Sequence, residues 1–144
     1  MALQYLTVQD VLWINLQVTG KPQPFDYADL EEATFYQYAY GDSKSLLPQA
    51  ARFLSGFLKK KPLASGNEAT ALISCLAFLK VNGYEFKGES LDTWFTEVQN
   101  GTAEARQAVE KDFYEAPRDH HVEIREALME LLKNHQNIAT LTPA

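Results

Sequence analysis

The chain has 144 residues, of which 46% are hydrophobic and 12% are aromatic. This is enough apolar material for the core of one domain, so we expect a single domain over residues 1–144. The formal net charge of −6 argues against a general nucleic-acid binder or membrane-surface binder, because polyanions would be repelled.

Cysteine content and the N-terminal residues bear on the compartment. Cys75 is the only cysteine, which excludes an intramolecular disulfide and a thiolate metal cluster and suits a reducing cytoplasm. The first ten residues lack the basic segment and uninterrupted apolar run of a signal peptide. No stretch is apolar for long enough to span a bilayer. We therefore expect a cytoplasmic protein.

The first predicted helix runs from about Val8 to Val18. Thr7 can cap it, Asp10 lies near its positive end, and apolar residues recur at helical spacing. A second helix is predicted to follow Asp26 and extend to about Tyr40. Its aromatic residues could instead favour a strand, and they could either pack in the core or form a partner-binding surface: Phe35, Tyr36, Tyr38 and Tyr40.

The clearest amphipathic pattern begins at Ser45. Apolar residues follow it at the spacing of a helix with one buried face: Leu46, Leu47, Ala50, Phe53, Leu54, Phe57 and Leu58. Lys59 to Lys61 end this helix, where cations are favourable, and Pro62 stops it. The next helix, from Asn67 to Val81, is apolar on all sides and is therefore predicted to lie at the centre of the fold.

The rest of the chain is also predicted to be helical. Asn82 and Gly83 stop the central helix, and shorter helices are predicted after Ser90 and after Thr102. A last amphipathic helix is predicted over about Asp119 to Asn134, and residues 136–144 are expected to be a loose tail. Since alternation typical of strands is scarce, we predict an all-α fold with at most a short hairpin.

Two other groups of residues could carry chemistry. Residues near the start of the last helix could suggest a metal site, but neighbouring histidines point to different helix faces, which favours surface side chains: Asp119, His120, His121 and Glu123. Cys75 lies within the apolar central helix, where a thiol is normally inert packing material rather than a nucleophile.

Several short blocks follow one another in an order that resembles the Fic/Doc (Fido) family, in its death-on-curing (Doc) branch. The blocks are Tyr5-Leu6-Thr7, Asp26 with Leu30 to Ala33, Ala50-Ala51, Pro62-x-x-x-Gly66-Asn67-x-x-Thr70-Ala71, and Phe78-Leu79-x-x-Asn82-Gly83-Tyr84. The resemblance is clearest over residues 3–110. It implies a Fic/Doc-type helical bundle around a buried central helix, about Asn67–Val81.

Members of this family carry a motif written His-Pro-Phe-x-Asp/Glu-Gly-Asn-x-Arg, with which they transfer AMP or phosphate from a nucleotide to a protein hydroxyl. Here Lys61 stands at the position of the histidine base, and Ser65 at that of the magnesium-binding acid. Leu63 replaces the aromatic residue, and Ala69 replaces the phosphate-binding arginine. The positions that match the family are Pro62, Gly66, Asn67, Thr70 and Ala71.

Each replacement removes a chemical function. An unperturbed lysine amine, with a pKa of about 10.4, is protonated at neutral pH and cannot accept a proton, and losing a general base costs roughly 10²–10⁴-fold in rate. Ser65 offers magnesium a neutral hydroxyl instead of a carboxylate, and Ala69 cannot neutralise phosphoryl charge. We therefore predict no catalytic residue and no metal ligand in this motif.

The main chain of the motif could still attract an anion, because Gly66 and Asn67 lead into a helix with free N–H groups. Glu68, in the first turn, favours the helix dipole by roughly 0.3–1 kcal/mol but would repel a phosphate. The structural alternative is that Gly66 relieves a tight turn and Asn67 caps the helix. The candidate ligand-binding residues are Lys61, Ser65, Gly66, Asn67 and Thr70.

Three functions are compatible with these residues. The first is a degenerate Doc-like module that binds an antitoxin-like or target protein, or another copy of itself, with little or no nucleotide transfer. No cofactor is then expected. The second is a divergent transferase in which Lys61 works with ATP or another nucleotide and magnesium, and the third is a toxin that acts by another route.

Overall fold

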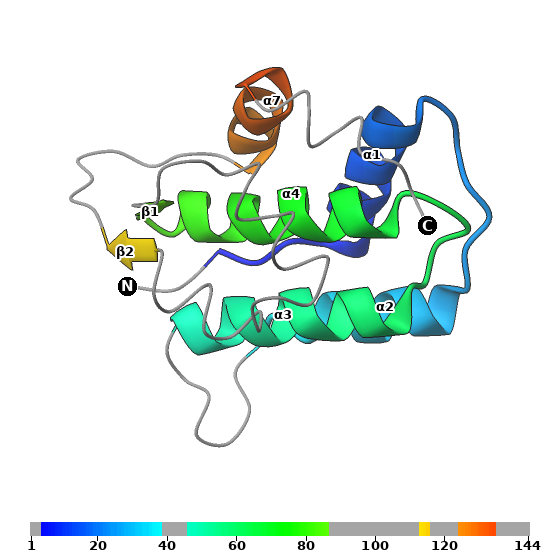
Figure 1. Ribbon diagram of the computed structural model, residues 1–144, viewed down its shortest axis with the longest axis horizontal. Helices are drawn as coiled ribbons and strands as arrows, with labels where there is room; N and C mark the ends of the chain where they lie inside the picture. Colours follow the sequence, from blue (N-terminus) through cyan, green and yellow to red (C-terminus); the bar gives the residue numbers. More distant parts are fainter. Residues whose placement is uncertain (1–3, 39–45, 87–112, 116–123, 135–144) are drawn as a thin grey trace.

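The computed structural model describes residues 4–38, 46–86, 113–115 and 124–134. Five helices and two short strands lie in these ranges, so the all-α prediction is confirmed. The strands β1 (Tyr84–Phe86) and β2 (Phe113–Glu115) form one small antiparallel pair, with Tyr84 opposite Glu115. This strand pair lies at the end of the bundle (Figure 1).

The first two helices begin where their capping residues predict. Helix α1 (Val8–Thr19) starts with a capping box, in which the Thr7 side chain accepts from Asp10 N–H and the Asp10 carboxylate accepts from Thr7 N–H. Helix α2 (Tyr27–Phe35) is capped by Asp26, which accepts from Asp29 N–H at 2.9 Å.

Helix α2 is shorter than predicted. It ends at Phe35, residues 36–38 form a turn, and the remainder of the predicted helix lies outside the described residues. Gln37 explains this end: its side-chain amide is buried, accepts from Leu6 N–H and donates to the carbonyls of Leu6 and Thr34. The Gln37 side chain thus anchors the N-terminal segment and does not continue a helical face.

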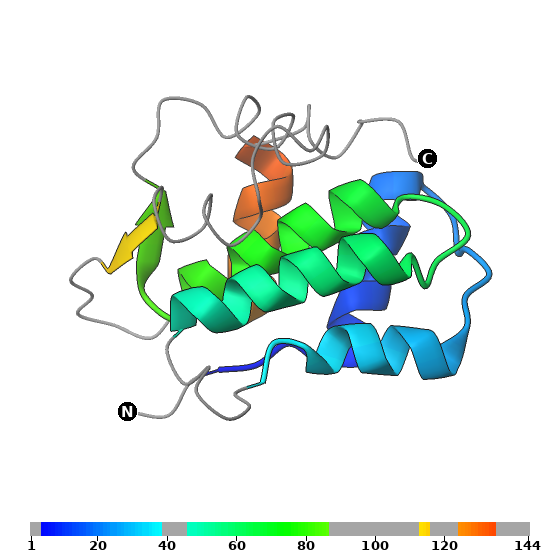
Figure 2. The ribbon, with the colours of Figure 1, turned by 60° about the horizontal axis from the view of Figure 1, so that its bottom comes forward.

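Helices α3 (Leu46–Lys60) and α4 (Asn67–Val81) form an antiparallel pair joined by the connection 61–66 (Figures 1 and 2). The predicted central helix is confirmed at both ends. Every residue of α4 except Lys80 is buried, since α3, α1 and α7 all pack against it. The last of these, α7 (Ile124–Asn134), lies on the opposite side of α4 from α3 (Figure 1).

The C-terminal end of α4 is tied to the start of the chain. The Asn82 amide accepts from Gln4 N–H at 2.8 Å and donates to the carbonyls of Gln4 and Phe78. Gly83, at φ 88°, turns the chain into β1, as predicted from the Asn-Gly pair. Buried apolar side chains from these helices form one core, including Ile14, Leu30, Phe53, Phe57, Leu72, Phe78 and Leu128.

Several predictions fall on residues outside the described ranges. They include the helices after Ser90 and Thr102, the residues Asp119, His120, His121 and Glu123, and the tail 136–144. The first part of the predicted last helix lies there too, and its described part begins at Ile124. Among the helices that are described, none has the length and apolar character needed to cross a bilayer. The single-domain prediction stays a prediction.

Candidate functional site

The turn that connects α3 to α4, residues 61–66, brings most of the predicted site residues together. It begins with Lys61 in the left-handed conformation, at φ 46°, while Lys61 N–H still donates to Phe57 O at 3.0 Å. It ends with Gly66, also left-handed, at φ 78°. A non-glycine residue in this region costs about 1–2 kcal/mol, so the strain at Lys61 is held by the main-chain hydrogen bonds of Lys61 and of the following Pro62.

Main-chain contacts hold this turn against the start of α2. Asp26 N–H donates to Pro62 O at 3.1 Å, and Ala64 N–H donates to Pro24 O at 2.9 Å. Leu63 is buried and forms an isolated antiparallel bridge with Phe25. The turn is therefore fixed on one side by two hydrogen bonds to a segment far away in the sequence.

Asn67 does not cap α4 in the predicted way. The N-cap is Gly66, and no side chain accepts from the first-turn N–H groups. The Asn67 side chain turns back instead: its Oδ1 accepts from Leu63 N–H at 3.0 Å and its Nδ2 donates to Leu63 O at 2.8 Å. The expected cap is wrong because Asn67 is already inside the helix, so its amide closes the turn as a bidentate clamp.

Gly66 is required by close neighbours as well as by its conformation. A Cβ atom at Gly66 would lie 2.7 Å from Thr19 Cγ2 and 2.9 Å from Asn15 Nδ2. The buried Asn15 amide donates to Ser65 O at 2.9 Å and to Thr70 Oγ1 at 3.1 Å. These two acceptors explain why a polar side chain can be buried here.

Thr70 and Ser65 thus serve the fold in this arrangement. The Thr70 hydroxyl faces α1, where Asn15 binds it, and Ser65 enters the contact with Asn15 through its carbonyl. Sequence reasoning missed Asn15 and Thr19. One signal was present: Asn15 comes four residues after the apolar Val11 and so falls on the buried face of α1.

The two charges of the turn face each other. Lys61 Nζ lies 4.0 Å from Glu68 Oε1, and the Lys61 side chain is 54% exposed whereas that of Glu68 is 8% exposed. Glu68 lies in the first turn of α4, as predicted. The negative charge of its carboxylate therefore interacts favourably with the positive end of the helix dipole and with the Lys61 ammonium group.

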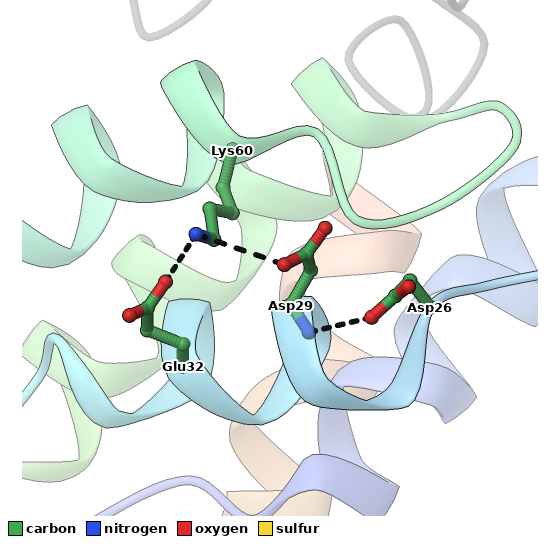
Figure 3. Close-up of polar contacts among 4 residues, drawn as sticks. All are labelled: Asp26, Asp29, Glu32 and Lys60. Atoms are coloured by element: carbon green, nitrogen blue, oxygen red, sulfur yellow. Dashed lines mark hydrogen bonds and ion pairs between the residues drawn. The ribbon is translucent and has the colours of Figure 1, made fainter.

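A different ion-pair network surrounds Lys60. Lys60 Nζ contacts the carboxylates of Glu32 and Asp29, the latter at 3.6 Å, and so ties the end of α3 to α2 (Figure 3). The hydrogen bond to Glu32, helped by the nearby charge of Asp29, raises the pKa of Lys60 above its ordinary value. Two of the three lysines at the helix end, Lys60 and Lys61, therefore have carboxylate partners within the chain.

Cys75 is buried in the core, and its Sγ lies 3.7 Å from Ala50 O. Burial raises the pKa of the Cys75 thiol to about 12, because the thiolate would be poorly solvated. The thiol is therefore protonated at neutral pH, as expected for a packing residue.

The residues of the turn do not fit a magnesium–nucleotide complex. Asn67 Oδ1 accepts from Leu63 N–H and is engaged within the chain. The position of the acid holds Ser65, and the buried Ala69 offers no cation to a phosphate. Within the described ranges, no group of three or more histidine, cysteine or acidic residues could hold a metal ion.

Comparisons with known proteins found no matching family model, no matching curated protein and no matching solved structure.

Proposed function

We propose that this chain is a degenerate Doc-like protein, of the death-on-curing family, that acts by binding and transfers little or no nucleotide. In this proposal it is a cytoplasmic binding or regulatory module related to toxin–antitoxin systems. Its partner is an antitoxin-like protein, a target protein or a second copy of the chain. The order of sequence blocks around Pro62, Gly66, Asn67 and Asn82 supports the family assignment.

One observation carries the functional part of the proposal: the side chains of Asn67 and Glu68, at the start of α4, already have partners within the chain. The Asn67 amide is bonded to both main-chain groups of Leu63, and the Glu68 carboxylate lies against Lys61. A nucleotide would have to displace these partners and would meet the negative charge of Glu68. Since breaking a buried hydrogen bond costs about 1–3 kcal/mol, the turn is poorly suited to bind a triphosphate.

Labelled nucleotide provides the direct test. Purified chain is incubated with labelled ATP and other nucleotides, magnesium and a cell extract, and protein-bound label is measured. The proposal predicts no transfer above background. Labelling that is abolished by Lys61→Ala, but kept by Lys59→Ala at an exposed position of the same lysine run, would refute it.

The alternative is a divergent Fic/Doc transferase that moves AMP or phosphate from a nucleotide to a protein hydroxyl. Lys61 favours it, since a strained, half-exposed cation beside a helix N-terminus is a feature of functional sites. Thermal melting with ATP, GTP, UDP-sugars or CDP-alcohols, with and without magnesium, separates the two functions. A saturable rise in melting temperature supports the transferase, and no rise with any donor supports the binding module.

A further inference from the structure

A second polar region lies on the outer face of α2, where it meets α3. A hollow of about 410 Å³ opens there, and it shares no residue with the turn 61–66. Residues from both helices line it: Ala28, Glu31, Glu32, Phe35, Tyr36 and Arg52. Because Ala28 and Glu32 are exposed and Phe35 is 40% exposed, the hollow is shallow. It would not enclose most of a small molecule, as a typical ligand pocket does.

Exposed aromatic side chains occur along α2 and directly before it, and one of them, Phe35, lines the hollow. Large hydrophobic side chains are exposed at four positions in the described part of the chain, and three belong to α2 or directly precede it: Phe25, Tyr27 and Phe35. Phe35 also forms an edge-to-face contact with Tyr38, with ring centroids 5.6 Å apart. Aromatic residues on a protein surface are frequent anchors of protein–protein contacts.

The floor of the hollow is held in place before any partner arrives. The Tyr36 ring lies so close to Gly56 that a Cβ there would be 2.3 Å from Tyr36 Cδ2. Arg52 Nε donates to Tyr36 O at 3.1 Å, and Arg52 Nη2 donates to Tyr38 O. A surface fixed in this way loses little conformational freedom on binding.

The charge of the hollow favours a basic partner. Carboxylates of Glu31 and Glu32 line it, and Asp29 is close by through the shared contact with Lys60. The side chains of Glu32 and Asp29 remain 52% and 47% exposed despite that ion pair. Arg52 also lines the hollow and keeps its positive charge while it donates to main-chain carbonyls, so two carboxylates stand against one cation in the lining. With the net charge of −6 on the chain, this face would attract cations from a distance.

We propose that the hollow between α2 and α3 is a docking surface for a basic, amphipathic helix of a partner protein. An arginine or lysine of that helix lays its aliphatic stem on Phe35 and Tyr36 and directs its charge to Glu31 or Glu32. Apolar neighbours on the same helix cover Tyr27 and Ala28. This assignment rests on the proposed function, in which the chain acts by binding. It adds the place of binding and the chemistry of the partner.

A displayed library of helical peptides tests this assignment on the full-length chain. The proposal predicts that selected peptides carry lysine or arginine next to apolar residues at helical spacing. Phe35→Ala should weaken their binding about tenfold, the size expected for an interface anchor. Glu31→Gln should weaken it about threefold and reduce its dependence on salt. Met129→Ala, which removes an exposed apolar side chain from α7, should leave affinity unchanged.

Each other outcome contradicts the assignment. Selected peptides that are acidic or uncharged, peptides that bind Phe35→Ala as tightly as wild type, or an unenriched library would each overturn it. A concentration-dependent dimer that Phe35→Ala dissociates would assign the face to a second copy instead. Melting curves test whether both variants are folded. If Phe35→Ala is unfolded, the binding of Glu31→Gln decides between the outcomes. Nucleotide transfer by a chain that still binds basic peptides through Phe35 would refute the proposed function and leave this surface standing.

Discussion

The turn before α4 and the outer face of α2 are both polar, but they use their polar groups differently. In the turn, the Asn67 amide is bonded to Leu63 and the Glu68 carboxylate lies against Lys61. On the α2 face, the side chains of Glu32 and Phe35 remain exposed to solvent, although Glu32 pairs with Lys60 and Phe35 contacts Tyr38. The sequence blocks that resemble an enzyme family lie in the first region. The side chains that are exposed and could contact a partner lie in the second.

This contrast shows that matching a motif and offering a ligand-binding group are separate properties. Asn67 matches its family position, yet its side chain is consumed in closing the turn. Phe35 and Glu31 match no catalytic motif, yet both line the hollow, where Phe35 is 40% exposed. Substitutions at Gly66 and Asn67 test the contacts that close the turn, and substitutions at Gly56 and Lys60 test the contacts between α2 and α3.

The largest effect is expected from Gly66→Ala. The new Cβ would meet Thr19 and Asn15 within 3 Å, and the left-handed backbone would be strained, so we expect a loss of about 2–4 kcal/mol in unfolding free energy. Gly20→Ala is the matched control. Gly20 has a similar φ of 82° with nothing within 4 Å, and should lose only about 1–2 kcal/mol. Equal losses in urea denaturation would show that the close approach at Gly66 is absent.

A smaller loss is expected from Asn67→Ala, which removes the clamp on the turn. Both main-chain groups of Leu63 would lose their partners in a buried setting, at a cost of about 1–3 kcal/mol. Hydrogen exchange of Leu63 N–H should become faster in the variant than in wild type. Unchanged stability together with unchanged protection of that amide would mean that Asn67 is not a clamp and is free for a ligand.

Gly56→Ala tests the floor of the α2 hollow. The methyl group collides with the Tyr36 ring, which costs about 1–3 kcal/mol and outweighs the gain of up to about 1 kcal/mol from higher helix propensity. In a Tyr36→Ala background the collision is gone, so the same substitution should become stabilising. A double-mutant cycle by denaturation measures this change of sign. The same destabilisation in both backgrounds would contradict the contact between Tyr36 and Gly56.

The smallest effect concerns Lys60, whose ion pairs are exposed to solvent. Its pKa is raised in the folded chain, so its contribution to stability is complete below the ordinary value of 10.5 and is lost as pH rises through the folded value. Replacing Lys60 by methionine should therefore flatten the decline in stability above about pH 10.5. Parallel pH profiles of melting temperature for wild type and variant would show that the ion pairs of Lys60 do not contribute to the stability of the fold.

The sequence predicts helices well where a local pattern determines them. The cap at Thr7, the stripe of α3 and the apolar circumference of α4 each arise from spacing within one segment, and each is found. The end of α2 is predicted poorly because Gln37 is drawn to main-chain groups of Leu6, about thirty residues away. No local pattern carries that contact.

In the candidate site, too, local features are predicted from the sequence and contacts between distant residues are not. The sequence places Lys61, Ser65 and Gly66 in one turn and Asn67 at the start of the next helix, and the structure agrees. It does not reveal that Asn67 turns back to Leu63, or that Asn15 of α1 fills the space beside Gly66. Likewise, the hollow beside Phe35 depends on Tyr36 packing against Gly56 of α3, which only the tertiary fold brings together.

Calorimetric titration of the full-length chain with ATP and magnesium tests the central claim most directly, because it measures binding at the turn independently of any chemical step. If Asn67 and Glu68 are engaged within the chain, no saturable heat should be observed at millimolar nucleotide. Saturable binding at micromolar nucleotide that Asn67→Ala abolishes would contradict the account.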